Sequence, residues 1–195
     1  MRDCAASCRV IAGRLACLAG PLALRNRSSR EWAGDMSGSV FAADEILVAV
    51  HFDAARCRLR RLAGDGVLLG AAEYAYGSGI TGLVEMVGAA AGMSRMAGVR
   101  TEDIAEKPDR ARLWLRWEAT GPEGTVYPAL DAALTLTPAG ETATLLALAG
   151  VYRLPGQTEA GLDPAIVRCF AAVAIRSFIA RLACALIHPA GVALR

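Results

Sequence analysis

The chain has 195 residues, of which 54% are hydrophobic, 6% aromatic and 21% charged, and its formal net charge is +2 at pH 7. This length favours one domain, which would bury roughly 70% of its extended surface. A charge so close to neutral argues against nucleic acid or an acidic partner. No stretch reaches about 18 uninterrupted apolar residues, so we expect no membrane span.

The first 35 residues differ in composition from the rest of the chain. Three of the six cysteines lie here, namely Cys4, Cys8 and Cys17. Arginines ahead of the apolar stretch 10–24 give this segment one feature of a secretory signal. However, Arg14 interrupts that stretch, and no clean small-residue cleavage site comes after it. A secretory signal is therefore the less favoured interpretation.

Met36 offers a second start for the chain, directly before the first predicted strand. We therefore interpret residues 1–35 as a poorly ordered N-terminal extension or a mis-assigned start. One domain is expected over residues 36–188, with a short tail over 189–195. The domain contains no internal repeat and no long linker.

A strand and two helices are predicted to open the domain. Residues 41–52 alternate in the manner of a strand, and Asp53 is expected to cap a helix over 54–63. Four arginines mark the outer side of that helix: Arg56, Arg58, Arg60 and Arg61. Such a cluster can contact phosphate or lipid headgroups, but a solvated face is the favoured interpretation. A second helical piece is predicted over 67–76, with helical spacing of Leu68, Leu69, Ala72 and Tyr76.

The next segment is interpreted as a turn and two strands. Gly77-Ser78-Gly79 lacks the lysine of a phosphate loop, so a turn is the favoured interpretation. It leads into a predicted strand over 80–87. A further strand is predicted over 97–106, after a loop rich in glycine and methionine.

Two hairpins form the centre of the predicted sheet. In residues 111–119, apolar residues alternate with polar or large ones, which places Leu113, Leu115 and Trp117 on one buried face. A turn that contains glycine and proline comes next, and the returning strand is predicted over 125–137. The last strand, over 142–152, is apolar on both faces at its centre and is therefore expected to be a covered strand.

A long helix is predicted to end the domain. Asp163 and Pro164 suit its N-terminus, and His188-Pro189 ends it. Its only charged residues are Arg168, Arg176 and Arg181. The apolar stripe is wider than a surface helix needs, and it contains Leu162, Ile166, Phe170, Val173, Ile175, Phe178, Ile179 and Leu182. We expect this helix to lie across the sheet and to be covered on most sides.

The predicted fold class is α+β, with a curved antiparallel sheet of six or seven strands, two short helices after the first strand and the long helix across the sheet. This order resembles the helix-grip fold of the START-related SRPBCC superfamily of polyketide cyclases, lipid-transfer proteins and the birch pollen allergen. The passages 115–121, 134–140, 145–152 and 161–187 are similar to actinobacterial members. The resemblance implies seven strands where six are predicted. It carries no catalytic motif from which residues could be transferred.

The residue types that carry chemistry do not form a recognisable motif. Neither His51 nor His188 has a partner at metal-ligand spacing, so no metal or cofactor is expected. Glu118 and Asp131 share the parity of polar residues and are expected to face solvent. The thiols Cys57, Cys169 and Cys184 lie among apolar helical residues, which favours a reduced, cytoplasmic protein.

Four aromatic residues are candidates for lining a cavity under the last helix: Trp117, Tyr152, Phe170 and Phe178. The favoured function is binding of a small apolar ligand, such as a lipid or a polyketide-like molecule, in that cavity. The alternative is a cyclase or dehydratase that uses the same cavity and moves protons with Tyr127, Tyr152 or Arg116. A third interpretation is a filled core with only a structural or interaction role. The absence of a buried pair of histidine and acid favours binding over catalysis.

Overall fold

The computed structural model describes residues 39–87, 95–120, 129–153 and 164–189. The predicted extension over 1–35 and nearly all of the tail lie outside these residues. The domain boundaries therefore stay predictions.

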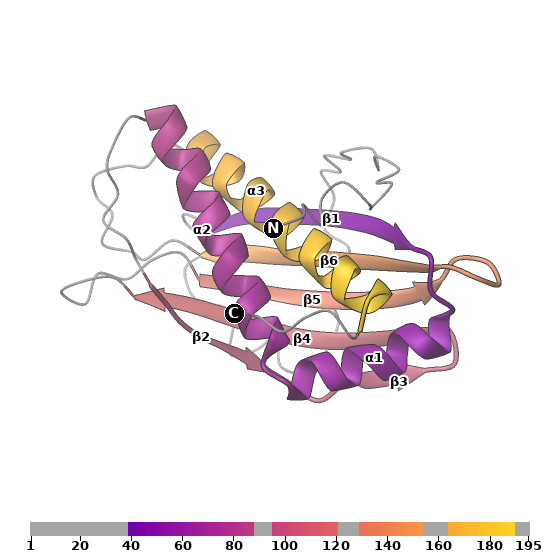
Figure 1. Ribbon diagram of the computed structural model, residues 1–195. Coiled ribbons are helices and arrows are strands. Elements are labelled where there is room, and N and C mark those ends of the chain that lie inside the picture. The colour runs from indigo at the N-terminus through magenta and orange to yellow at the C-terminus, as the bar shows by residue number, and fades with distance from the viewer. Residues whose placement is uncertain (1–38, 88–94, 121–128, 154–163, 190–195) are drawn as a thin grey trace.

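Six strands form one antiparallel sheet within the described part of the chain. The strands are β1 (Ser39–Val48), β2 (Arg95–Thr101), β3 (Ala105–Lys107), β4 (Arg110–Thr120), β5 (Ala129–Pro138) and β6 (Thr144–Arg153). Their order is β1-β6-β5-β4-β2, and the short β3 pairs with β4. The first strand thus pairs with the last, and β1 is an edge strand (Figure 1).

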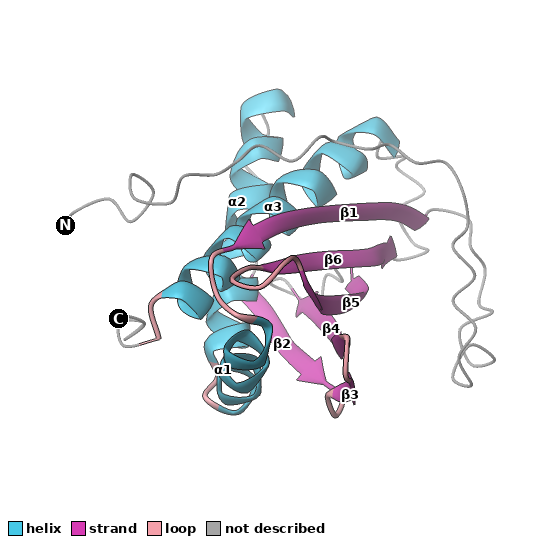
Figure 2. Cartoon of the chain, turned by 90° about the vertical axis from the view of Figure 1, so that its right-hand side faces the viewer, coloured by secondary structure: helices cyan, strands magenta, loops and turns pink. Residues whose placement is uncertain are grey.

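Three helices cover one face of this sheet. They are α1 (Phe52–Gly64), α2 (Val67–Val87) and α3 (Pro164–Ile187). α3 lies over β1 and β6, and α2 runs beside it toward β2 (Figure 1). Figure 2 shows that the curved sheet carries its described helices on one side. The predicted α+β helix-grip arrangement is therefore confirmed.

The strands bury the faces that their alternation predicts. On β4, Leu113, Leu115 and Trp117 point under the helices and are at most 3% exposed. The same face of β5 and β6 contributes Leu130, Leu134, Leu136, Leu146, Leu148 and Tyr152. Burial of each large apolar side chain stabilises the fold by roughly 1.5–3 kcal/mol. This layer is the main source of stability, and it joins the inner faces of α2 and α3.

The predicted strand over 80–87 is wrong, because α2 continues through it as one helix of 21 residues. Tertiary packing explains why the two glycines make no turn. A Cβ on Gly79 would lie 2.7 Å from the ring of Phe170, so the glycine allows α2 to approach α3 closely. Ser78 stays within the helix, where its hydroxyl donates to the carbonyl of Tyr74 at 2.9 Å.

The described sheet has six strands, as predicted, but they are not the same six segments of the chain. Residues predicted as one strand over 97–106 form parts of β2 and β3. A seventh strand near residues 88–96 was implied by the resemblance, but residues 88–94 lie outside the described part of the chain.

The start of α1 also differs from the prediction. His51, not Asp53, is the N-cap, and its Nδ1 accepts the backbone N–H of Asp53 at 3.3 Å. Three of the four arginines of α1 contact other parts of the fold, while Arg61 is exposed as a solvated face predicts. Arg58 donates to the carbonyl of Leu186 at 2.5 Å, where α3 has carbonyls without helical partners. Arg60 pairs with Glu106 on β3.

α3 begins and ends where its sequence signals predict, at Pro164 and Ile187. Among the stripe residues whose side chains the structure describes, Val173 is misplaced, because it is 38% exposed while Phe170 is 2% exposed. Leu162 lies outside the described residues. Residues Val167–Ile187 are long and apolar enough to cross a membrane by length and composition alone. In this fold, that helix buries Phe178, Ile179 and Leu182 against the rest of the domain, which is the arrangement of a core helix.

Candidate functional site

The four predicted aromatic residues meet in one cluster between the sheet and α3. Trp117 of β4 lies 5.1 Å from Phe178 of α3, measured between ring centroids, and 6.2 Å from Tyr152 of β6. The ring of Phe170 lies 5.7 Å from that of Tyr152. Two of these contacts are edge-to-face, a geometry worth about 0.5–1.5 kcal/mol beyond burial.

Strand register explains why the two sheet residues meet. Trp117 is directly opposite Leu130 on β5, and Leu130 is directly opposite Tyr152 on β6. Directly opposed residues point to the same side of a sheet, so the two large rings flank Leu130 in one row. This row lies near the end of the sheet where β4 and β6 end and β5 begins.

A fifth ring completes the cluster and was not predicted as a site residue. Tyr76 of α2 lies 5.4 Å from the ring of Phe170 and is 4% exposed. Tyr76 lies four residues after Ala72 and eight after Leu68, and both are buried. This helical spacing could have predicted that Tyr76 faces the core. Leu69, expected on the same stripe, is 40% exposed instead. The name "ring cluster" refers below to Tyr76, Trp117, Tyr152, Phe170 and Phe178.

Two polar atoms of the ring cluster are buried without a hydrogen-bond partner among the described residues. They are Nε1 of Trp117 and the hydroxyl oxygen of Tyr152. Burial raises the pKa of the Tyr152 phenol well above its ordinary value, and the nearby Tyr76 adds to the rise. The phenol therefore stays protonated at neutral pH, and both groups are hydrogen-bond donors in need of an acceptor.

Arg116 cannot serve this cluster, which corrects its proposed role in proton transfer. It lies on the opposite, outer face of β4, where its Nε is 2.6 Å from Glu118 and 3.6 Å from Asp131. Asp131 also pairs with Arg153 of β6. The two acids thus belong to an ion network on the outer face. The Glu118 side chain is 40% exposed, as predicted, but the Asp131 side chain is only 10% exposed, because Arg153 and Arg116 lie against it. Tyr127 lies outside the described residues.

A pocket that the structure describes lies elsewhere. It is an open pocket of about 560 Å³ between the end of α1 and the β2–β3 connection, bordered by Arg60, Thr101, Glu102, Asp103 and Glu106. The carboxylate of Glu106 is already engaged by Arg60, whose hydrogen bond holds the pKa of Glu106 below its ordinary value. This pocket brings together none of the predicted site residues.

The described residues contain no group of three or more histidine, cysteine or acidic side chains that could hold a metal. His51 and His188 are exposed at the start of α1 and just after α3. Cys57 and Cys169 are free thiols. Within this part of the chain, the chemistry available at the ring cluster is therefore apolar contact and hydrogen-bond donation.

No family model and no curated protein matches the chain. The structure is similar to the Zhui aromatase/cyclase from Streptomyces sp. R1128, at a TM-score of 0.33 and 10% identity over 79% of this chain and 99% of that one. It is also similar to the Mll3558 protein from Rhizobium loti, at a TM-score of 0.35 and 15% identity over 73% and 96%. A third similarity is to norcoclaurine synthase from Thalictrum flavum, solved with dopamine and hydroxybenzaldehyde, at 0.26 and 10% over 71% and 85%. At these TM-scores, the similarities carry no argument about function.

Proposed function

We propose that the protein binds a small, largely apolar molecule at the ring cluster, between the sheet and helices α2 and α3. The observation that carries this proposal is the pair of buried donors, Trp117 Nε1 and the Tyr152 hydroxyl. A buried donor without a partner costs about 1–3 kcal/mol, and two of them in one row of a well-packed core require an explanation.

A ligand that carries a hydrogen-bond acceptor would explain the two buried donors, because it would accept a hydrogen bond from them. One carbonyl, ether or hydroxyl oxygen among mostly apolar atoms satisfies a donor and fills the space between rings. The rings are in contact in the structure, so an entering molecule has to rotate or displace some of them. Phe170 is the ring that joins Tyr76 to Tyr152, and its movement would open the cluster between α2 and α3.

Binding is favoured over proton-transfer catalysis at this site. A cyclase or dehydratase needs a group that accepts a proton near neutral pH. The Tyr152 phenol has its pKa raised, so it can donate a hydrogen bond but does not act as a base under those conditions. Both described histidines lie at helix ends, away from the rings. The free thiols of Cys57 and Cys169 fit a reducing compartment, so we propose a cytoplasmic location.

The test uses Prodan, a fluorescent apolar ketone, and its parent naphthalene that lacks the carbonyl group. We expect the wild-type protein to bind both, and Tyr152→Phe to weaken Prodan binding about tenfold while leaving the parent unchanged. Tyr74→Phe is the matched control, because Tyr74 is 53% exposed on α2. If wild type takes up neither probe, the proposal fails and the rings are a filled core.

A further inference from the structure

β1 is the longest stretch of backbone at a sheet edge in the described part of the chain. Its ten residues pair with β6 in one unbroken register, from Ser39 opposite Arg153 to Val48 opposite Thr144. No other described strand pairs with its far side. Proteins usually protect such an edge with lysine, proline or a bulge. β1 has none of these three devices, and its protection is limited to the charged pair Asp44 and Glu45, where Asp44 points inward and accepts the backbone N–H of Glu45 at 2.9 Å.

The outer face of β1 carries two large apolar side chains that are exposed to solvent. Phe41 is 60% exposed and Leu47 is 49% exposed. Both belong to the outward parity of β1, and they are symmetric in sequence about Asp44. A two-fold axis through Asp44, normal to the sheet, therefore places Phe41 of one chain directly opposite Leu47 of another. Directly opposed apolar pairs stabilise antiparallel strands.

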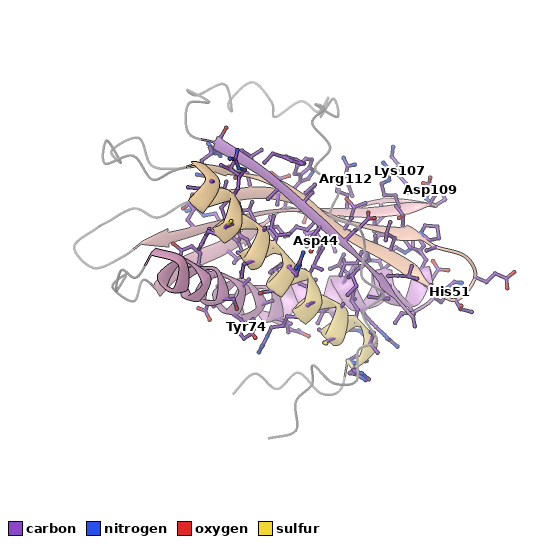
Figure 3. The ribbon with its side chains drawn as sticks, turned by 90° about the horizontal axis from the view of Figure 1, so that it is seen from above. Asp44, His51, Tyr74, Lys107, Asp109 and Arg112 are labelled. Carbon is purple, nitrogen blue, oxygen red and sulfur yellow. The ribbon has the colours of Figure 1, made fainter. Side chains whose placement is uncertain are left out.

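The charged residues on the inner side of β1 are also compatible with this two-fold axis. Asp44 faces α3, where its Oδ2 lies 3.5 Å from Nε of Arg176, and Figure 3 shows Asp44 at the junction of β1 and α3. Two Asp44 side chains would meet at the axis. Each brings an Arg176 that is 63% exposed, so the four groups sum to zero charge.

Neighbouring registers are less favourable. An axis through Ala43 would place Phe41 opposite Glu45 of the second chain. An axis through Glu45 would place the two Glu45 side chains opposite each other. Like charges directly opposed are destabilising, and no described ion pair offsets the charge of Glu45 as Arg176 offsets that of Asp44. Among the registers that place the outer faces of both strands on the same side of the sheet, the residue pattern of β1 thus favours the one centred on Asp44.

We propose that β1 pairs antiparallel with β1 of a second copy of this chain, centred on Asp44, to form a symmetric dimer with one continuous sheet of twelve strands. The partner is a second copy of the same chain, because Phe41 then lies opposite Leu47 and each Asp44 has its own Arg176. The surface is separate from the ring cluster, so ligand binding and dimerisation can fail independently.

The test is a charge exchange in the full chain, read by light scattering coupled to size exclusion under reducing conditions. Phe41→Glu alone and Leu47→Arg alone should each weaken the dimer about tenfold or more, since every change occurs twice in a symmetric interface. The double variant Phe41→Glu/Leu47→Arg should recover the dimer, because each new glutamate then lies opposite an arginine. Leu69→Arg, an exposed apolar position on α2, should leave it unchanged.

Two outcomes would overturn the proposal. Wild-type protein that is monomeric at high micromolar concentration shows that the edge takes no second copy. A double variant no more dimeric than the single ones shows that the register is wrong. Circular dichroism of each variant separates loss of pairing from loss of folding.

Discussion

The two faces of the same sheet carry different kinds of polar group. On the outer face, Asp131 is held by Arg153 and Arg116, and Arg116 also contacts Glu118. On the inner face, Trp117 Nε1 and the Tyr152 hydroxyl are buried with no partner among the described residues. Charges at a surface can find partners with little cost, whereas a donor in a dry core must be matched or it destabilises the fold. Buried atoms without a hydrogen-bond partner also occur on the outer face, for example Nε of Arg112, so the inner face is marked as the candidate site by donors that are neutral and lie among aromatic rings.

The largest expected effect contrasts the two sides of α3. Phe170→Asp would bury a charge against the rings of Tyr76 and Tyr152, at a cost of several kcal/mol, comparable to the stability of the whole domain. Insoluble protein is the expected result. Val173→Asp lies on the exposed side of the helix and should change the free energy of unfolding by less than about 1 kcal/mol. Urea denaturation checks both, and a soluble, cooperatively folding Phe170→Asp variant would contradict the assignment of the inner face.

A second expected effect tests the contact between α2 and α3. Gly79→Ala places a Cβ within 2.8 Å of two Phe170 ring atoms and 3.3 Å from the Cβ of Ala174, and should destabilise the protein by about 1–3 kcal/mol. Gly77→Ala meets no atom within 4 Å and should stabilise α2 by up to about 1 kcal/mol. Thermal unfolding of the two variants gives the comparison. Equal shifts would mean that α2 does not approach α3 at Gly79.

The smallest expected effect is a dependence of stability on alkaline pH. The pKa of Tyr152 is raised in the folded protein, so the unfolded chain loses this proton first. The stability held by the protonated phenol is thus fully present below about pH 10, the ordinary value of tyrosine, and falls as pH rises toward the folded pKa. Tyr152→Phe should flatten this fall, measured by denaturant midpoints between pH 8 and 11, while Tyr74→Phe should leave it as in wild type.

Local signals predicted β1, β4, β5, β6 and α3, because their information lies within the segments themselves. Alternation in β4 placed Trp117 inside and Arg116 outside, and the residues at each end of α3 fixed its bounds. The same reasoning failed for Gly77-Ser78-Gly79, because a turn signal and a close helix contact use the same residue. Only the approach of α2 to Phe170 distinguishes them, and that approach depends on the whole fold.

Most residues of the candidate site could be predicted from the sequence, but the way they pack against one another could not. Parity and helical spacing brought Trp117, Tyr152, Phe170 and Phe178 to the space under α3. The ring of Tyr76 reaches this cluster because α2 is one continuous helix beside α3. No local pattern in the sequence predicts that position of α2. The lack of partners for two donors is likewise a property of the assembled core, because a hydrogen bond is satisfied by neighbours from any part of the chain.

The central claim, that the ring cluster holds a small apolar molecule, is tested most directly by native mass spectrometry of the full chain. The account predicts one additional small mass per chain, present after purification or after incubation with Prodan, and reduced by Tyr152→Phe but not by Tyr74→Phe. Only the bare mass of the chain in both preparations would contradict it, and would leave the ring cluster as a filled core with two unmatched donors.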